Sequence, residues 1–139
     1  MSVAKRFEEL EAWQTARKLT QQVYELSNQG DFSRDYGLRD QMRRAAVSIR
    51  SNIAEGFESR TGGLFLEFLG RAKGSAGEVR AQVYVAHDVK YLARPQAIKL
   101  RAECEKCSGQ IRRFMAYLKA NPRAGIAVAK TGGPAQGTR

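Results

Sequence analysis

Few side chains in this sequence could act as an acid, a base or a nucleophile. Glu55 and Glu78 recur at helical spacing with other polar residues, but a catalytic pair of carboxylates needs an apolar setting that raises the pKa of one of them. Both glutamates instead lie among arginine, serine and asparagine. Ser48 and Ser75 could attack a substrate only beside a base, and neither has a histidine at helical spacing. The sequence therefore predicts a protein that is not an enzyme and has no catalytic residue.

Residues that could bind a metal are equally sparse. His87 is the single histidine, and Cys104 and Cys107 form the one Cys-x-x-Cys pair. A structural zinc site needs four ligands, a redox Cys-x-x-Cys needs a strand-to-helix setting, and a di-metal carboxylate bundle needs Glu-x-x-His on two helices. Because none of these patterns is complete, we expect no metal and no cofactor. Both cysteines are expected to act as small apolar side chains of the core.

Apolar residues that recur every three or four positions predict four amphipathic helices. The first ends at the turn-forming residues 28–37, the second covers about 38–56, the third continues toward Leu92, and the fourth follows Pro95 and stops before Pro122. Short connections return each helix beside the previous one, so the predicted fold is all-α, an antiparallel up-down-up-down four-helix bundle. The residues expected in its core are Leu10, Trp13, Ala16, Leu19, Val23, Leu26, Met42, Ala45, Ile49, Ile53, Phe65, Phe68, Ala72, Ala76, Val79, Val83, Ala86, Ile98, Cys104, Cys107, Ile111, Phe114 and Leu118.

The length of 139 residues suits one domain with a substantial core. We assign residues 1–120 to the bundle and residues 121–139, which have no acidic residue and no helical period, to a disordered basic tail. The first residues carry charges where a signal peptide would be apolar, and no apolar run approaches the roughly 20 residues of a membrane span. We therefore expect a cytoplasmic protein that does not bind a membrane.

The charge of the chain narrows the list of partners. Lys and Arg total 24 against 14 Asp and Glu, for a formal net charge of +10, and 16 of the cations are arginine. Arginine favours bidentate contact with phosphate or carboxylate, so the excess suggests an anionic partner, although a basic surface also serves solubility alone. The sequence has no zinc-finger spacing, RNP-type motif or glycine-rich phosphate loop, and its aromatic residues mostly belong to the core stripes. The candidate nucleic-acid contacts are Arg39, Arg43, Arg50, Arg112 and Arg113.

A second, polar stripe flanks the apolar one on both the second and the third predicted helix. At 100° per residue the two polar stripes could meet as a partly buried network, with ion pairs such as Arg44 with Glu78 or Arg71 with Glu55. The alternative is that both stripes are solvated boundaries, because charged side chains usually remain in water. The candidate buried polar seam comprises Arg44, Ser48, Asn52, Glu55, Arg71, Ser75, Glu78 and Gln82.

Small residues gather on the side of the third predicted helix that lies opposite its core stripe. Each glycine inside a helix costs about 1 kcal/mol relative to alanine. Several glycines on one outward face suggest that another helix approaches closely there, and a four-helix monomer has no further helix to supply. We therefore expect a second copy of the chain at this face, with tolerated surface glycines as the alternative. The candidate subunit interface is Gly70, Gly74, Gly77 and Ala81.

Two segments together resemble the signature of a known bacterial family of four-helix bundles. Residues 43–57 read RRAAVSIRSNIAEGF and residues 68–79 read FLGRAKGSAGEV, flanked by EELEAWQTARKL at 8–19 and YGLRDQ at 36–41. The family is the one that includes proteins encoded in intervening sequences of 23S ribosomal RNA genes. The resemblance implies a bundle that assembles into a homopentameric ring with a basic surface. A distant branch, the accessory variability determinant of diversity-generating retroelements, partners a reverse transcriptase and binds nucleic acid.

These observations favour one function over a second. The first is a non-enzymatic, oligomeric scaffold whose basic surface associates with RNA or DNA through phosphate contacts. The alternative is a protein-interaction module that binds an acidic protein partner and no nucleic acid. The resemblance does not decide between them, because it implies no established biochemical activity for the branch that this sequence is closer to, and fold alone does not determine function.

Overall fold

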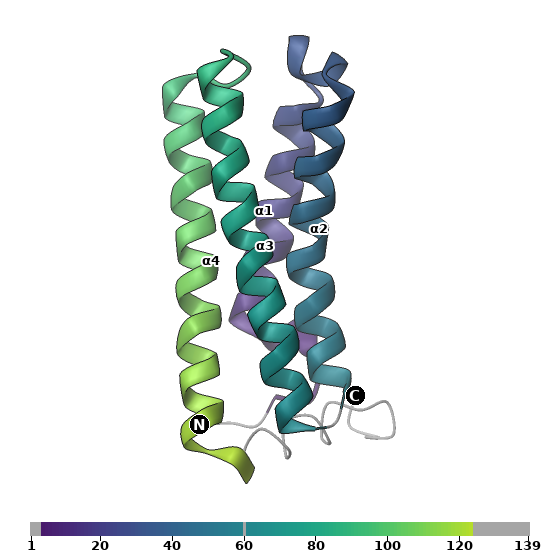
Figure 1. Ribbon diagram of the computed structural model, residues 1–139, viewed down its shortest axis with the longest axis vertical. Helices are drawn as coiled ribbons and strands as arrows, with labels where there is room; N and C mark the ends of the chain where they lie inside the picture. Colours follow the sequence, from purple (N-terminus) through teal and green to yellow (C-terminus); the bar gives the residue numbers. More distant parts are fainter. Residues whose placement is uncertain (1–3, 60, 124–139) are drawn as a thin grey trace.

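The computed structural model describes residues 4–59 and 61–123 of the chain, and its regular elements are all helical. Figure 1 shows four long, roughly antiparallel helices side by side, which confirms the predicted all-α, up-down-up-down bundle. The α-helices are α1 (Glu11–Ser27), α2 (Tyr36–Glu58), α3 (Gly62–Asp88) and α4 (Arg94–Ala120), with the short 3-10 helices η1 (Phe7–Glu9) and η2 (Gly30–Arg34) at the two ends of α1.

Each helix packs on its neighbours in the chain, and α4 returns to pack on α1, so the four form a closed ring. Helices α2 and α4 consequently face each other across the bundle, as do α1 and α3. The α1–α2 and α3–α4 connections lie at one end, and the α2–α3 connection lies at the other (Figure 1). Of the helices in residues 4–59 and 61–123, none has both the length and the apolar character of a membrane span.

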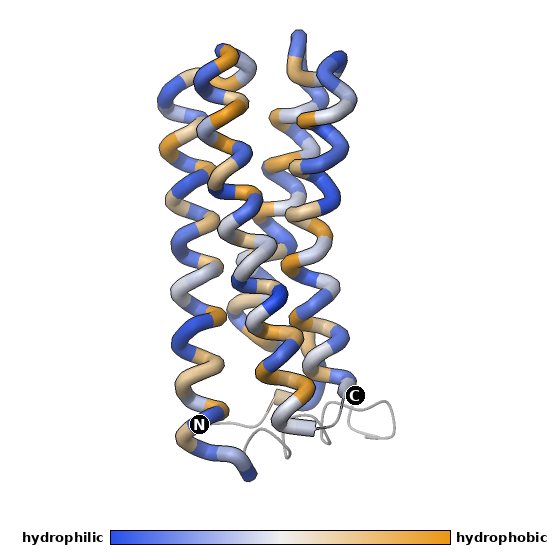
Figure 2. Tube along the Cα trace, viewed as in Figure 1, coloured by the Kyte–Doolittle hydropathy of each residue, from blue (hydrophilic) through white to orange (hydrophobic). Residues whose placement is uncertain are grey.

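One apolar core runs the length of the bundle. Figure 2 shows apolar and polar residues alternating around every helix, which is the pattern of a helix with one buried side. The interior is closed by aromatic and aliphatic side chains that are almost completely buried. The buried hydroxyl of Thr20 is satisfied there, because it donates to the carbonyl of Ala16 at 2.7 Å and lies 3.3 Å from the carbonyl of Ala46 on α2. The largest of these buried side chains are Phe32, Phe57, Phe65, Leu19, Met42, Ile49 and Ile53.

Two predicted core residues lie outside the core, because Phe68 is only half-buried and Ile98 is exposed. Ile98 is 45% exposed, whereas Ala97 and Leu100 are buried. The reason is the phase of α4, since the buried positions 97, 100, 104, 107, 111 and 118 follow a three- and four-residue spacing that leaves position 98 to one side. The helix itself begins at Arg94, one residue before Pro95.

A carboxylate joins the two connections at the end of the bundle where α1 meets α2. Asp35 caps α2, because its Oδ1 accepts a hydrogen bond from the backbone N–H of Leu38 at 3.1 Å. Its Oδ2 accepts a second bond from the hydroxyl of Tyr91 at 2.9 Å, and the ring of Tyr91 stacks on Phe32 with 5.2 Å between centroids. This cap starts α2 at Tyr36, two residues before the predicted start, and Tyr91 lies in the α3–α4 connection beyond the end of α3.

Replacing Asp35 with alanine is expected to lower the free energy of unfolding by about 1 kcal/mol, the usual effect of losing an N-cap. Tyr91→Phe keeps the stacked ring and the cap and removes only the cross-connection bond of a solvent-accessible hydroxyl, so its expected loss is smaller. Urea denaturation at one fixed protein concentration measures both. Equal losses for the two variants would show that the cap contributes nothing.

Candidate nucleic-acid interface

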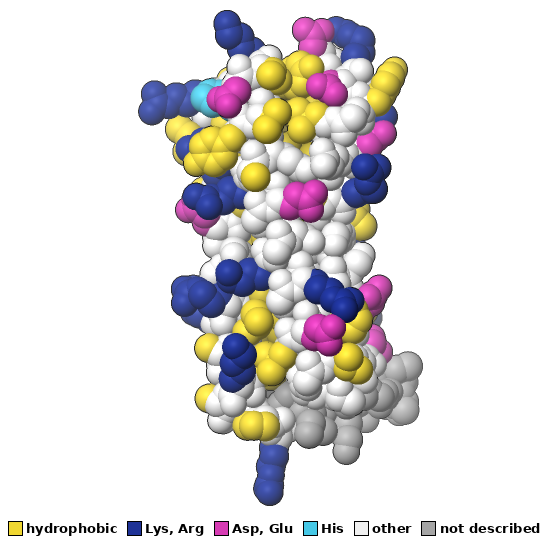
Figure 3. All heavy atoms as spheres, in the orientation of Figure 1, with side chains coloured by type: hydrophobic (Ala, Val, Ile, Leu, Met, Phe, Trp, Pro, Cys, Tyr) yellow, Lys and Arg dark blue, Asp and Glu magenta, His cyan; other side chains and the backbone are white. Residues whose placement is uncertain are grey.

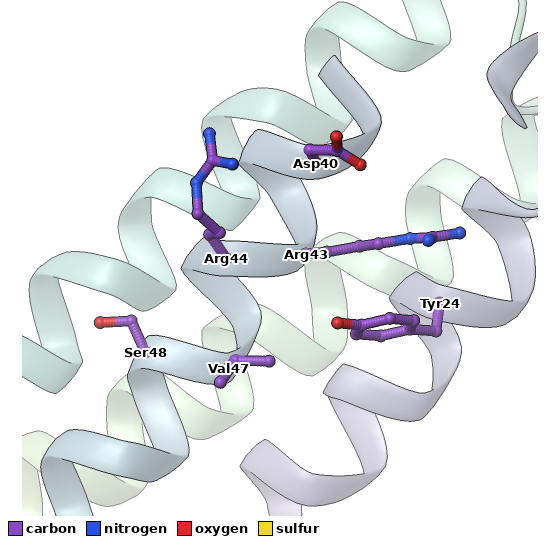
Figure 4. Close-up of a pocket in the computed structure, with 6 residues that line it drawn as sticks. All are labelled: Tyr24, Asp40, Arg43, Arg44, Val47 and Ser48. Atoms are coloured by element: carbon purple, nitrogen blue, oxygen red, sulfur yellow. The ribbon is translucent and has the colours of Figure 1, made fainter. Parts of the chain in front are cut away.

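Arginine side chains lie on aromatic rings along the boundary between α1 and α2. The guanidinium carbon of Arg43 is 4.6 Å from the centre of the Tyr24 ring, and Figure 4 shows the Arg43 side chain extended over that ring. Arg39 lies in the same way on Tyr36, at 4.7 Å. Contacts of this length are favourable cation–π interactions. We call this set the arginine–aromatic row; its members are Arg17, Arg39, Arg43 and Arg50 with Trp13, Tyr24 and Tyr36.

The other end of the row is built around the single tryptophan. The ring of Trp13 contacts Arg17 of its own helix at 5.7 Å and Arg50 of α2 at 5.4 Å. Trp13 itself is only 8% exposed, so the two arginines cover the rim of a core residue. Within α2 the helical rise places Arg39 and Arg43 about 6 Å apart along the axis, with Arg50 about 10 Å further on.

Hydrogen bonds hold part of the row in place. The Nε–H of Arg43 donates to the Ser27 hydroxyl at 2.8 Å, and Nη1 of Arg39 donates to the Ser33 carbonyl at 2.9 Å. The Nε–H of Arg39 also donates to Asp40 at 2.8 Å, and this bond lowers the pKa of the Asp40 carboxyl. Among the described residues, no carboxylate lies within ion-pair distance of Arg17, Arg43 or Arg50, so most of the charge of the row is uncompensated.

The remaining two candidate arginines lie elsewhere. Arg112 and Arg113 are exposed residues of α4, the helix that faces α2 across the bundle. The five candidate contacts predicted from sequence therefore divide into a row at the α1–α2 boundary and a separate pair on α4. One copy of the chain therefore does not present all five arginines on a single surface.

The polar stripes of α2 and α3 meet through their uncharged members. The hydroxyls of Ser48 and Ser75 lie 3.0 Å apart across the two helices, and Nδ2 of Asn52 donates to the carbonyl and the hydroxyl of Ser48 at 2.8 and 3.0 Å. Gln82 is buried and donates to Glu78 on its own helix at 3.3 Å. The Ser48–Ser75 bond joins α2 to α3 and fixes their register at that level of the bundle, whereas the bonds of Asn52 and Gln82 stay within their own helices.

The charged members of the predicted seam form no ion pair between α2 and α3 in the described part of the chain. Arg44, Glu55, Arg71 and Glu78 are all exposed, and Arg71 pairs with Glu67 one turn earlier on its own helix, at 2.8 Å. The predicted ion pairs of Arg44 with Glu78 and of Arg71 with Glu55 are absent from the described part of the chain, so that prediction is wrong. Burial would have cost these side chains their hydration, and a local pair in water is the cheaper arrangement.

The small residues of α3 form an open strip on its outer face. Gly70, Gly74, Gly77 and Ala81 are exposed. A Cβ atom added at Gly74 or Gly77 would meet nothing within 4 Å, and one at Gly70 would meet only the tip of Met115, at 3.9 Å. Figure 3 views this side of the bundle and shows a pale central band with few charged side chains between apolar patches. Nothing in the described chain packs on this strip.

These elements carry the pattern of a known family. A model of the 23S rRNA-intervening sequence protein matches residues 8–113. The chain belongs to the 23S rRNA-intervening sequence protein family. The match covers the α1–α2 boundary, the polar network and the outer strip of α3, and it confirms the resemblance found in the sequence. Comparison with curated proteins finds no match.

In this member of the 23S rRNA-intervening sequence protein family, most aromatic residues serve the core as predicted, and three tyrosines are exceptions. Tyr24, Tyr36 and Tyr84 are 43%, 63% and 45% exposed. Each carries an arginine on its ring, from α2 for the first two and from α4 for Tyr84. A signal was available in the sequence, since Tyr24 follows Val23 and therefore lies beside the apolar stripe of α1 instead of on it.

The Cys-x-x-Cys pair lies in the core, as predicted. Cys104 and Cys107 are 1% and 0% exposed, and the Cys107 thiol lies 3.7 Å from the Ala12 carbonyl. Burial raises the pKa of both thiols to about 12, because the apolar surroundings disfavour the thiolate. Residues 4–59 and 61–123 contain no group of three His, Cys, Asp or Glu side chains placed to hold a metal ion.

The buried thiols predict that stability falls at high pH. In the unfolded chain each thiol ionises near pH 9.0, whereas in the folded chain its pKa is about 12. The stabilisation is therefore complete below pH 9 and is lost as pH rises through this interval, at about 1.4 kcal/mol per pH unit for each thiol. Urea denaturation from pH 8 to 11 measures the fall. The double variant Cys104→Ala, Cys107→Ala should show a shallower decline, and an identical decline would refute the assignment.

Proposed function

We propose that this protein is a non-enzymatic, oligomeric scaffold that associates with RNA or DNA through phosphate contacts. The observation that carries the proposal is the arginine–aromatic row, in which Arg17, Arg43 and Arg50 have no carboxylate partner among the described residues. Uncompensated arginines attract polyanions, and a guanidinium can donate two parallel hydrogen bonds to one phosphate.

The ordered position of the Arg43 side chain also supports nucleic-acid binding. Arg43 is held from below by Tyr24 and at its Nε by Ser27, so its two terminal nitrogens remain free for a ligand while the side chain is already ordered. Ordering a free arginine on binding costs about 0.5–1.5 kcal/mol, and much of that cost is removed here. The guanidiniums of Arg17, Arg43 and Arg50, which lie on aromatic rings and have no carboxylate partner among the described residues, suit the negative charge of a nucleic-acid backbone.

Assembly is the second part of the proposal. The open strip of α3 suits close approach of a helix from a second copy, and the family resemblance points to a homopentamer. The strip lies on α3, the helix that faces α1 across the bundle, whereas the arginine–aromatic row lies where α1 meets α2. An assembly through α3 therefore leaves the row of each copy available for a ligand.

A salt titration of nucleic-acid binding tests the proposal. The affinity of the protein for a labelled RNA should fall linearly on a log–log plot against salt concentration, because each phosphate contact releases counterions. Arg43→Gln with Arg50→Gln should lower the affinity about tenfold at about 50 mM salt and reduce the slope by about 1.5, the share of two contacts. The matched control is Arg112→Gln with Arg113→Gln, which removes the same charge from α4.

Two results would change the conclusion. Equal losses for the two double variants would mean that net charge, and not the row, determines binding. No measurable affinity for RNA or DNA even at low salt would reject the proposal and favour an acidic protein as the partner of the same arginines.

A further inference from the structure

A hollow opens on the surface of α2 beside the arginine–aromatic row. It has a volume of about 580 Å³. In Figure 4 the Tyr24 ring reaches toward α2 from α1, while Arg43 and Arg44 leave α2 in different directions on either side of the opening. The lining residues are Tyr24, Asp40, Arg43, Arg44, Val47 and Ser48.

The hollow combines apolar surface with unpaired positive charge. Tyr24 is 43% exposed and Val47 is 38% exposed, so an aromatic ring and a branched aliphatic side chain both face the solvent there. Arg44 is exposed and, like Arg43, has no carboxylate within ion-pair distance among the described residues. The Ser48 side chain lies at the rim.

This combination distinguishes between two forms of nucleic acid. A duplex presents phosphates outward and keeps its bases stacked inside, so it would cover Tyr24 and Val47 without giving them an apolar partner. A single strand can turn one base outward, and base–aromatic stacking together with a basic groove is the usual basis of single-strand binding. The apolar surface of Tyr24 and Val47 therefore gains an apolar partner only when an unpaired nucleotide binds.

We propose that the hollow binds one unpaired nucleotide of a single strand, with its base against Tyr24 and Val47 and the phosphates on either side of that base on Arg43 and on Arg44. The inference rests on the function proposed above and names the form of nucleic acid that this surface prefers. Asp40 sets the orientation, because it is the one carboxylate of the lining and repels phosphate from its side. Its bond to Arg39 holds it ionised, as an acceptor for an amino group of the base.

The proposal is tested by measuring binding at one salt concentration to three ligands. These are a labelled 12-nucleotide RNA, the same RNA annealed to its complement, and single-stranded DNA of the same sequence. We expect the single-stranded RNA to bind about tenfold more tightly than the duplex. Tyr24→Leu should remove that preference by weakening single-strand binding about tenfold, and Tyr24→Phe should preserve it because the ring remains. If the hollow recognises only the base by stacking and the phosphate by charge, single-stranded DNA should bind as tightly as single-stranded RNA. Single-stranded DNA that binds no more tightly than duplex RNA would contradict recognition through stacking and phosphate alone.

The chain offers a matched control on its opposite side. Tyr84 is 45% exposed and carries Arg101 at 4.7 Å, against 43% and 4.6 Å for Tyr24 and Arg43. Tyr84→Leu should leave single-strand binding unchanged. Equal binding of single strand and duplex, or equal losses in Tyr24→Leu and Tyr84→Leu, would overturn the inference while the proposed function stands. No binding of any nucleic acid by the wild-type protein would overturn both.

Discussion

Replacing Gly56 with alanine is expected to lower the free energy of unfolding by about 2 kcal/mol. Gly56 is buried in α2 where that helix crosses α3, and a Cβ atom there would lie 2.8 Å from Cβ of Phe68 and 3.3 Å from the backbone oxygen of Phe65. Neither atom can rotate away, so the two helices must separate. Overpacking of this kind costs up to about 3 kcal/mol, and the better helix propensity of alanine offsets about 1 kcal/mol.

Gly109→Ala is the matched control, because Gly109 lies inside α4, outside the proposed subunit interface, and an added Cβ would meet only the flexible end of the Arg113 side chain, at 3.2 Å. The same chemical change should there raise the free energy of unfolding by up to about 1 kcal/mol. Urea denaturation of both variants at one protein concentration makes the comparison. A Gly56→Ala protein as stable as the wild type would show that α2 and α3 can move apart at no cost.

Replacing both Gly74 and Gly77 with glutamine is expected to convert the proposed oligomer to a monomer with an intact fold. The two positions form the centre of the open strip, and at neither one would an added Cβ meet an atom within 4 Å, so an exposed glutamine can extend into solvent. In an assembly through α3, however, two glutamines would prevent close approach of the neighbouring backbone. Native mass spectrometry at micromolar concentration should show the monomer mass, with an unchanged circular dichroism spectrum.

A control for this variant comes from α4. Ala102 and Ala116 are exposed, and replacing both with glutamine adds the same groups to a different face. That protein should keep the mass of the wild-type assembly. A wild-type protein that is itself monomeric at this concentration would disprove assembly through α3, and an oligomeric Gly74→Gln, Gly77→Gln protein would place the interface elsewhere.

The helices and most of the core could be predicted because burial selects residues by the period of each helix. The apolar stripes of α1 and α2 lie where the sequence places them, from Trp13 to Val23 and from Met42 to Ile53. Ile98 shows the limit of this reasoning, since an apolar residue one step from the stripe has the right type and the wrong phase. The period of a helix predicts the direction of a side chain only when several neighbouring apolar residues follow the same period.

The candidate site could be predicted in part. The sequence indicated Arg39, Arg43 and Arg50, but it could not show which aromatic rings they contact. The ring comes from α1 for Arg43 and Arg50 and from the preceding turn of α2 for Arg39, and a cation–π contact leaves no mark on the apolar period of a helix. The ion pairs predicted for the polar seam are wrong for a related reason. A stripe on a helix identifies a face, but the choice of partner was decided by distance, and Glu67 lies one turn from Arg71 on the same helix.

The position of Trp13 gives the molecule a built-in optical reporter. The chain has one tryptophan, and it lies on α1 with both Arg17 of its own helix and Arg50 of α2 within cation–π distance of its ring. The ring is 8% exposed, so separation of α1 from α2 would expose it to water and remove the Arg50 contact. The emission of a single indole therefore follows the docking of α1, the shortest of the four α-helices, onto α2.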